Sequence, residues 1–138
     1  MTDVRDAANK LFDAMNNKDW DTIRDALHPD YVYTGPDGEE AHGIEAGLAA
    51  GWTDHAAGFP DLRVEVKSLY ADGDVVITEF AFSGTHSGPW AGIEPTGKKV
   101  GAAVCNLMQF RDGRLYRERD YMDTLSIFAQ MGVVDLPS

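Results

Sequence analysis

The segment LRVEVKSLYADGDVVITEFAFSGTH, residues 62–86, gives the clearest indication of the fold. Its first part alternates apolar and polar residues, with Leu62, Val64 and Val66 on one face, as expected for a half-buried β-strand. The turn Ala-Asp-Gly-Asp follows, and a second run of β-branched and aromatic residues returns after it. The stretch therefore predicts an antiparallel hairpin, onto which later strands can add.

Helices are expected before this hairpin. Apolar residues recur at helical spacing in residues 2–15, with Thr2 as the N-cap, and again in residues 20–27. A short strand at 31–33 precedes a third helical pattern over residues 44–59. Each pattern has an apolar face that must be buried, so these helices are expected to pack on the sheet.

Two further strands and a last helix follow the hairpin. The strands are predicted at residues 98–110 and 115–123, joined by the turn Arg-Asp-Gly-Arg, and the helix carries Leu125, Phe128 and Met131. Helices at one end of the chain and strands after them predict an α+β fold, with helices covering one face of a curved antiparallel sheet. The length suits a single domain spanning residues 1–138.

Composition excludes several classes of function. The chain carries 12 basic and 23 acidic residues, a net charge of −11, so a nucleic-acid partner is not expected. No apolar run is long enough to span a membrane, which predicts a cytoplasmic protein without a membrane partner. The single cysteine, Cys105, rules out an internal disulfide and is expected to be buried and inert. The four histidines lack metal-site spacing, so no metal is predicted.

The segment RERDYMD, residues 117–123, poses the functional question. Asp120 is either a surface carboxylate paired with Arg117 or Arg119, or a base aimed into a cavity. Spacing alone favours the surface alternative. A three-residue loop at 111–113 would instead place Asp120 on the same face as Asn106, with both arginines on the other face. The face of Asp120 would also carry Met108, Phe110 and Tyr116, which are predicted to bind the substrate.

Four segments resemble the SnoaL-like polyketide cyclase family of the nuclear transport factor 2-like superfamily. They are HPDYV (28–32), GFPDLRVEV (58–66), SGTHSGPWAGIEPTGKKV (83–100) and FRDGRLYRERDYMDTLSIFAQMG (110–132). The resemblance implies a cone-shaped fold with a pocket between the helices and the concave face of the sheet. It also implies intramolecular aldol cyclisation of a polyketide ester without metal or cofactor.

The resemblance assigns roles residue by residue. Asp120 matches the family's base, whereas the histidine that characterised cyclases use in the preceding strand is replaced here by Asn106. Asparagine can donate a hydrogen bond to an enolate oxygen but cannot transfer a proton near neutral pH. His86 also matches the family, and it either donates to a substrate carbonyl or anchors the loop that follows it.

Aromatic residues supply candidates for the pocket wall. Trp52, Phe59 and Trp90 could line a site for a flat apolar ligand, although aromatics at such spacing also form ordinary core. The resulting prediction is an enzyme that removes a carbon-bound proton from a small hydrophobic carbonyl compound, by cyclisation or isomerisation. The alternative is a non-catalytic binder of a small molecule. A homo-oligomer, a dimer or tetramer formed through the convex sheet face bearing Arg117 and Arg119, is compatible with both.

Overall fold

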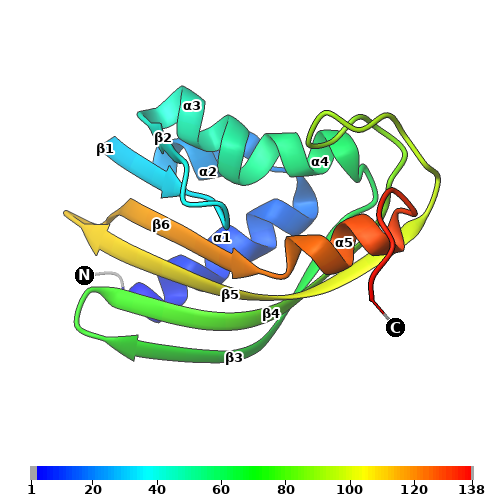
Figure 1. The fold of residues 1–138 in the computed structure, drawn as a ribbon. Coiled ribbons are helices and arrows are strands. Elements are labelled where there is room, and N and C mark those ends of the chain that lie inside the picture. Colours follow the sequence, from blue (N-terminus) through cyan, green and yellow to red (C-terminus); the bar gives the residue numbers. More distant parts are fainter. Residues whose placement is uncertain (1–2, 138) are drawn as a thin grey trace.

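The computed structural model describes residues 3–137, in which helices pack on one face of a curved six-stranded sheet (Figure 1). The predicted α+β class is confirmed. The helical elements are α1 (Val4–Asn17), α2 (Trp20–Ala26), α3 (Ile44–Leu48), the π-helical turn η1 (Ala49–Thr53), α4 (Asp54–Gly58) and α5 (Thr124–Gln130). The strands are β1 (Leu27–Thr34), β2 (Glu40–His42), β3 (Arg63–Asp72), β4 (Val75–Thr85), β5 (Lys99–Arg111) and β6 (Arg114–Met122).

The strands are arranged in the order β2-β1-β6-β5-β4-β3. The strands after the helices, β3 to β6, pair antiparallel as predicted. The sheet as a whole is mixed, because β1 pairs antiparallel with β2 but parallel with β6. Strands joined by a short turn must be antiparallel, but most of the chain separates β1 from β6 and leaves their direction free.

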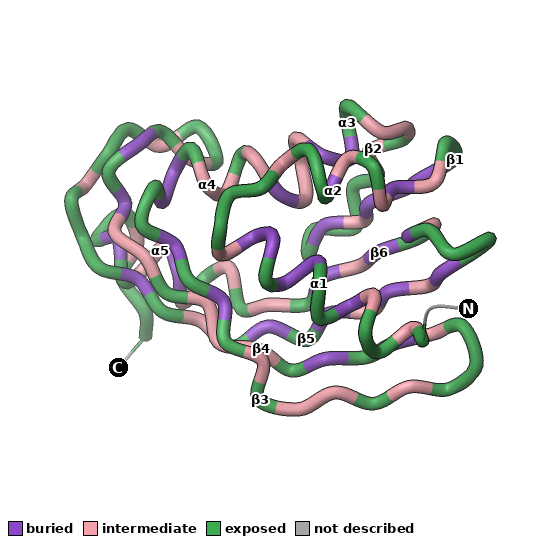
Figure 2. Tube along the Cα trace, turned by 180° about the vertical axis from the view of Figure 1, so that it is seen from behind, coloured by how far each residue is buried: buried purple, intermediate pink, exposed green. Residues whose placement is uncertain are grey.

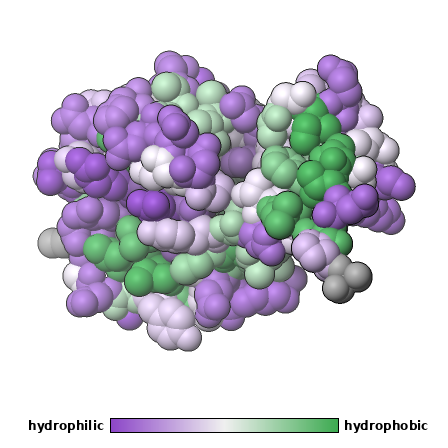
Figure 3. Space-filling model, viewed as in Figure 1, coloured by the Kyte–Doolittle hydropathy of each residue, from purple (hydrophilic) through white to green (hydrophobic). Residues whose placement is uncertain are grey.

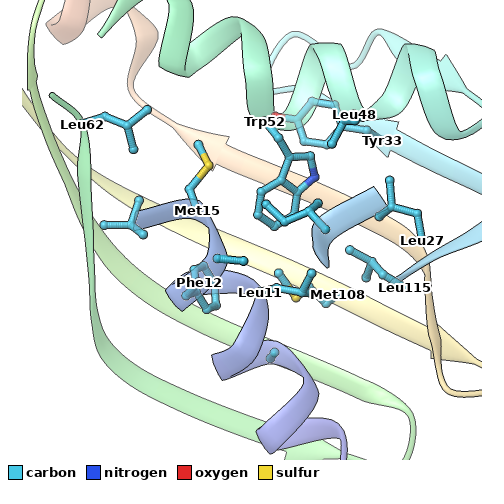
Figure 4. Packing of buried hydrophobic residues seen from close by; sticks show 14 of the residues in the cluster. Leu11, Phe12, Met15, Leu27, Tyr33, Leu48, Trp52, Leu62, Met108 and Leu115 are labelled. Carbon is cyan, nitrogen blue, oxygen red and sulfur yellow. The ribbon is translucent and has the colours of Figure 1, made fainter. Parts of the chain in front are cut away.

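The core lies between the helices and the concave face of the sheet (Figures 2 and 4). Helix α1 packs on β3 and β4 and buries Leu11, Phe12 and Met15. Its N-cap is Asp3, whose side chain accepts a hydrogen bond from the Arg5 amide; the predicted cap, Thr2, lies outside the described residues.

The third predicted helix is one continuous run of α3, η1 and α4, with a π-helical turn in its middle. The amide of Asp54 bonds the carbonyl of Ala49, five residues back, so one extra residue enters this turn. Such turns rotate the side chains that follow them and are frequent at functional sites. Here Trp52 and the next turn's His55 both reach the interior.

The turn between β5 and β6 differs from the predicted three-residue loop. Asp112 and Gly113 form a two-residue turn with φ angles of 54° and 76°. Phe110 therefore pairs with Leu115, and a bulge follows in which Tyr116 is the additional residue. Beyond the bulge the pairing places Asn106 directly opposite Asp120, on the concave face.

The odd-numbered residues of β5 and β6 beyond the bulge face outwards. Cys105 is consequently exposed, contrary to the prediction of a buried thiol. Exposed hydrophobic side chains gather at the end of the molecule formed by α5 and the segment after it, among them Leu125, Val133 and Leu136 (Figure 3). Within residues 3–137, no helix is long and apolar enough to cross a membrane.

The loop of residues 87–98, between β4 and β5, is held against α4 by close backbone contact. The amides of Ser87 and Gly88 both donate to the carbonyl of Gly58, at 3.2 and 3.1 Å. A Cβ atom on Gly88 would overlap the carbonyl oxygen of Ala57. The loop can therefore approach the helix this closely only with glycine at position 88.

Gly88→Ala is expected to lower the free energy of unfolding by about 2 kcal/mol, because the loop must move away from α4. Urea unfolding measures the change. Gly101→Ala is the matched control, since a Cβ there would lie 3.7 Å from its nearest neighbour, the carbonyl oxygen of Phe82. Equal stability of the two variants would contradict this account of the loop.

Candidate active site

A cavity lies between the helical layer and the concave face of β4, β5 and β6. Helix α1 contributes Phe12 and Met15, and the run from η1 to α4 contributes Trp52 and His55. The sheet supplies both apolar and polar groups. Most of the cavity wall is apolar. The apolar side chains from the sheet and from the segments beside it include Phe59, Phe80, Phe82, Trp90, Val104 and Met122.

Three polar side chains from β5 and β6 are buried at the sheet side of this cavity. Asn106 lies between two carboxyl groups, and its Nδ2 donates to Asp120 Oδ1 at 2.8 Å and to Glu118 Oε2 at 2.9 Å. All three residues are at most 6% exposed. One amide group therefore fixes the orientation of both carboxyl groups.

The remaining oxygens of the two carboxyl groups are bound by tyrosines from β1. Tyr33 donates its hydroxyl to Asp120 Oδ2 and Tyr31 donates to Glu118 Oε1, each at 2.6 Å. Trp52 Nε1 donates to the Tyr31 hydroxyl oxygen at 3.2 Å. Because β1 and β6 are neighbours and side chains alternate along a strand, the pairs Tyr31–Tyr33 and Glu118–Asp120 face each other in step.

Burial controls the charge of this cluster. Removal from water raises the pKa of Glu118 to about 8, helped by the neighbouring Asp120 charge, and burial also raises the pKa of Asp120. Within residues 3–137, neither carboxyl group has a salt-bridge partner; Arg117 and Arg119 lie on the other side of the sheet. Burial also raises the pKa values of Tyr31 and Tyr33, which remain hydrogen-bond donors.

His55 reaches the same cavity from α4. Its Nδ1 accepts a hydrogen bond from Trp90 Nε1 at 3.1 Å. Burial lowers the pKa of His55, although the charges of Asp120 and Asp54 act in the opposite direction. The imidazole is therefore neutral at physiological pH.

The structure brings together five of the predicted site residues. Asp120 and Asn106 lie at the sheet side of the cavity, and Trp52, Phe59 and Trp90 form part of its wall. The two arginines beside Asp120 point away, so its predicted inward orientation is confirmed.

Three residues predicted to bind substrate lie elsewhere. Met108 and Phe110 are buried in the hydrophobic core beyond the cavity, where Met108 lies near Leu11 and Leu115 (Figure 4). Tyr116 is the bulge residue and lies outside, with the Arg111 guanidinium 3.8 Å from its ring centre. The extra residue in the bulge shifts the alternation along β6 by one position, so Leu115, Glu118 and Asp120 are buried and Tyr116 does not share the face of Asp120.

His86 is buried but does not line the cavity. Its Nδ1 accepts a hydrogen bond from the Thr96 amide at 3.2 Å and contacts the Thr96 hydroxyl at 2.9 Å. Its backbone bonds Gly97 and Lys98. Of the two predicted alternatives, the structure supports the anchoring of the 87–98 loop.

Four residues of the site were not among the predicted site residues: Glu118 and His55, which line the cavity, and Tyr31 and Tyr33, which bind the two carboxyl groups. The alternations Tyr-Val-Tyr at 31–33 and Glu-Arg-Asp at 118–120 carry a signal, because each places two polar groups on one face of a strand. His55 has no comparable signal, since its direction depends on the π-helical turn before it.

Comparisons with known proteins place the chain in a family. The model of the SnoaL-like polyketide cyclase family matches residues 4–131. The chain belongs to this family.

Among its relatives, the nogalonic acid methyl ester cyclase of Streptomyces nogalater is 28% identical over 127 residues, covering 88% of this chain and 92% of the relative. The aklanonic acid methyl ester cyclase of Streptomyces galilaeus is 24% identical, with 91% and 88% covered. The solved structure of IdmH from Streptomyces antibioticus is 31% identical, with a TM-score of 0.78 over 96% of this chain and all (100%) of IdmH. A SnoaL-like structure from Jannaschia sp. CCS1 gives a TM-score of 0.87 at 24% identity, covering 96% and 93%.

This SnoaL-like domain has a wider recess outside the cavity, between the β1–β2 connection, α4, the 87–98 loop and the start of α5. Trp90, His55 and Met122 border both spaces, so they separate the recess from the cavity. Within the described residues, no Lys or Arg lines the recess. Its acidic side chains are Asp37, Glu39, Glu40, Asp54 and Asp123.

Within residues 3–137, no group of three or more His, Cys, Asp or Glu side chains is arranged to hold a metal ion. The polar side chains that line the cavity are Asp120, Glu118, Asn106 and His55, and the hydroxyls of Tyr31 and Tyr33 bond to the two carboxyl groups.

Proposed function

We propose that this protein is a cofactor-independent enzyme of the polyketide cyclase type, in which Asp120 removes a proton from carbon next to a carbonyl of a hydrophobic substrate. One observation carries the proposal: Asp120 is a buried carboxyl group that has no cationic partner within residues 3–137 and lies in a cavity whose wall is mostly apolar. Burial raises the pKa of Asp120 and makes its carboxylate a stronger base than one in water.

The proposed reaction conserves all atoms. Asp120 takes the proton from the acidic carbon, and the electron pair of the C–H bond forms an enolate. The enolate carbon then attacks a second carbonyl of the same molecule, which closes a ring and leaves an alkoxide. The proton held by Asp120 passes to this alkoxide, and the carboxylate is regenerated.

The neighbours of Asp120 support this assignment. Asn106 and Tyr33 each donate to one of its oxygens and so hold the carboxylate in position. Glu118 stays protonated below a pKa of about 8, which limits the repulsion between the two carboxyl groups near neutral pH. Asn106, which stands where characterised cyclases have a histidine, serves here to orient both carboxyl groups.

The charge around the recess supports an uncharged substrate. Carboxylates surround the entrance and the chain carries a net charge of −11, so an anionic molecule is repelled on approach. The curated relatives are named as cyclases of methyl esters, in which the acid group is masked. We propose a hydrophobic polyketide ester as the substrate class.

A methyl ester is therefore expected to be preferred over the matching free acid by about tenfold in kcat/KM at low salt. Added salt should reduce this preference, because it screens the exposed carboxylates. Steady-state kinetics of both compounds at two ionic strengths measures the effect. Asp37→Asn, at the rim of the recess, should lower the preference, whereas Asp72→Asn, exposed at the end of β3, should not. A preference for the acid would contradict the proposed entrance.

The function itself is tested by following hydrogen exchange in heavy water at the acidic carbon of an aromatic β-keto methyl ester. Exchange or ring closure that depends on the protein supports catalysis. Saturable binding of the ester without either reaction would favour the alternative, a non-catalytic binder of small molecules.

A further inference from the structure

His55 presents a shielded nitrogen to the cavity. Its Nε2 is buried from solvent and has no hydrogen-bond partner within the described residues. His55 lies in the helical layer and Asp120 in the sheet, and both line the same cavity. A molecule bound between them would contact His55 on one side and Asp120 on the other.

The hydrogen-bond pattern determines the tautomer of His55. The indole Nε1 of Trp90 can only donate, so His55 Nδ1 must be the accepting, unprotonated nitrogen. The neutral ring therefore carries its hydrogen on Nε2. His55 cannot act as a base through Nε2, but it can donate one hydrogen bond into the cavity.

Trp90 is fixed firmly enough to maintain this tautomer. A Cβ atom on Gly58 would lie 2.6 Å from Trp90 Cβ, so helix and indole are in close contact. The ring of Trp90 also packs edge-on against Phe59 and Phe128, with centroid distances of 5.4 and 6.2 Å. The donor to His55 Nδ1 thus has little freedom to move.

We propose that His55 is the oxyanion donor of the site: its neutral Nε2–H bonds the carbonyl oxygen of the substrate and stabilises the enolate that forms when Asp120 removes the proton. The inference rests on the proposed function and assigns the carbonyl-binding group of that site. No proton leaves His55 in this step, and the hydrogen bond strengthens as negative charge develops on the oxygen.

His86 provides an internal comparison. It too has a buried Nε2 without a partner among the described residues, and its Nδ1 accepts from the Thr96 amide. Yet His86 lies outside the cavity, whereas His55 lines it. A buried nitrogen without a partner therefore does not by itself make a site. His55 differs from His86 because it lines the same cavity as the buried carboxyl group of Asp120.

The tautomer is tested first, independently of any activity. Nitrogen NMR of the histidine-labelled protein, with His55→Phe to assign the signals, should find neutral His55 protonated at Nε2 at pH 7. Trp90→Phe removes the indole donor, so the Nδ1–H form should become populated. An imidazolium ion, or the Nδ1–H tautomer in the unaltered protein, would overturn the inference.

The donor is tested next with para-nitrophenol as an enolate analogue in Asp120→Asn. The neutral amide imitates the protonated Asp120 that faces the enolate, and absorbance reports whether the phenol binds as its anion. Adding His55→Phe should weaken binding of the anion by about tenfold to hundredfold, since one charged hydrogen bond is lost. His55→Gln, which keeps an N–H, should restore part of it. The inference would be overturned if Asp120→Asn did not bind the phenol anion. It would also be overturned if the anion bound equally tightly with and without His55→Phe.

Kinetics of α-proton exchange distinguishes a wrong role for His55 from a wrong proposed function. His55→Phe should lower kcat for α-proton exchange by about 10²-fold with a small change in KM, and His55→Gln should recover part of the loss. His42→Phe, an exposed histidine in β2, should have no effect. If the unaltered protein catalyses exchange and His55→Phe has the same kcat, only the proposed role of His55 is wrong. If the unaltered protein catalyses nothing, the proposed function fails, and the phenol experiment still decides whether His55 binds an oxyanion.

Discussion

Asp120→Asn is expected to lower the rate of α-proton exchange by about 10²–10⁴-fold, because the substrate loses the group that accepts its proton. Substrate affinity should be retained, since asparagine has the shape of aspartate and the apolar wall is unchanged. The Tyr33 hydroxyl and the Asn106 amide donate to Asp120, so the new side chain can keep only part of these bonds. Rate and affinity must therefore be measured separately, by single-turnover kinetics and calorimetric titration.

The matched control is Asp72→Asn, at the exposed end of β3, which should leave both rate and affinity unchanged. Loss of binding in Asp120→Asn equal to the loss of rate would contradict the assignment and indicate a receptor. Full activity in Asp120→Asn would show that Asp120 is not the base.

The stability of the fold is expected to fall as pH rises from about 4.5 to about 8. Glu118 has a pKa of about 8 in the folded protein and an ordinary value of 4.5 when exposed, so the folded state holds its proton over this interval and the unfolded state releases it. The unfolded state therefore gains stability as pH increases. The full loss is on the order of 5 kcal/mol and is complete above pH 8, where both states are ionised. Asp120 adds a contribution of the same sign, because burial raises its pKa as well.

Urea unfolding at a series of pH values measures this loss. Glu118→Gln should flatten the curve, since the variant has no proton to release at that position and no second charge beside Asp120. Glu65→Gln, exposed in β3, should keep the slope of the unaltered protein. Stability that rises between pH 5 and pH 8 would contradict the burial of an unpaired carboxyl cluster.

The sequence predicted the orientation of Asp120 correctly, but through a different turn. The prediction used a three-residue loop, whereas the chain forms a two-residue turn and adds Tyr116 as a bulge. Both arrangements shift the pairing by one residue and so place Asn106 and Asp120 on one face. The two arrangements place Tyr116 on different faces, which is why the predicted position of its side chain was wrong.

Other parts of the site depend on contacts that local patterns do not specify. The partnership of Tyr31 and Tyr33 with the two carboxyl groups requires β1 to lie beside β6, a pairing between distant segments. His55 enters the cavity because of the extra residue in η1 and gains its tautomer from Trp90, in a loop 35 positions later. The helical pattern over residues 44–59 predicted the helix and could not predict this turn within it.

The fold class was more accessible, because it follows from short-range patterns. The alternation in residues 62–86 and the turn within it define β3 and β4, and the helical periods before them define α1 and α2. Helices then have one place to bury their apolar faces, the concave side of the sheet.

The most direct test of the central claim is a titration of the two buried carboxyl groups by carbon NMR in the ligand-free protein, with Asp120→Asn and Glu118→Gln to assign the signals. We predict a pKa of Asp120 above its usual value of about 3.9 and a pKa of Glu118 near 8. A pKa of Asp120 at or below the usual value would mean a solvated or ion-paired carboxylate. That result would contradict Asp120 as the buried base.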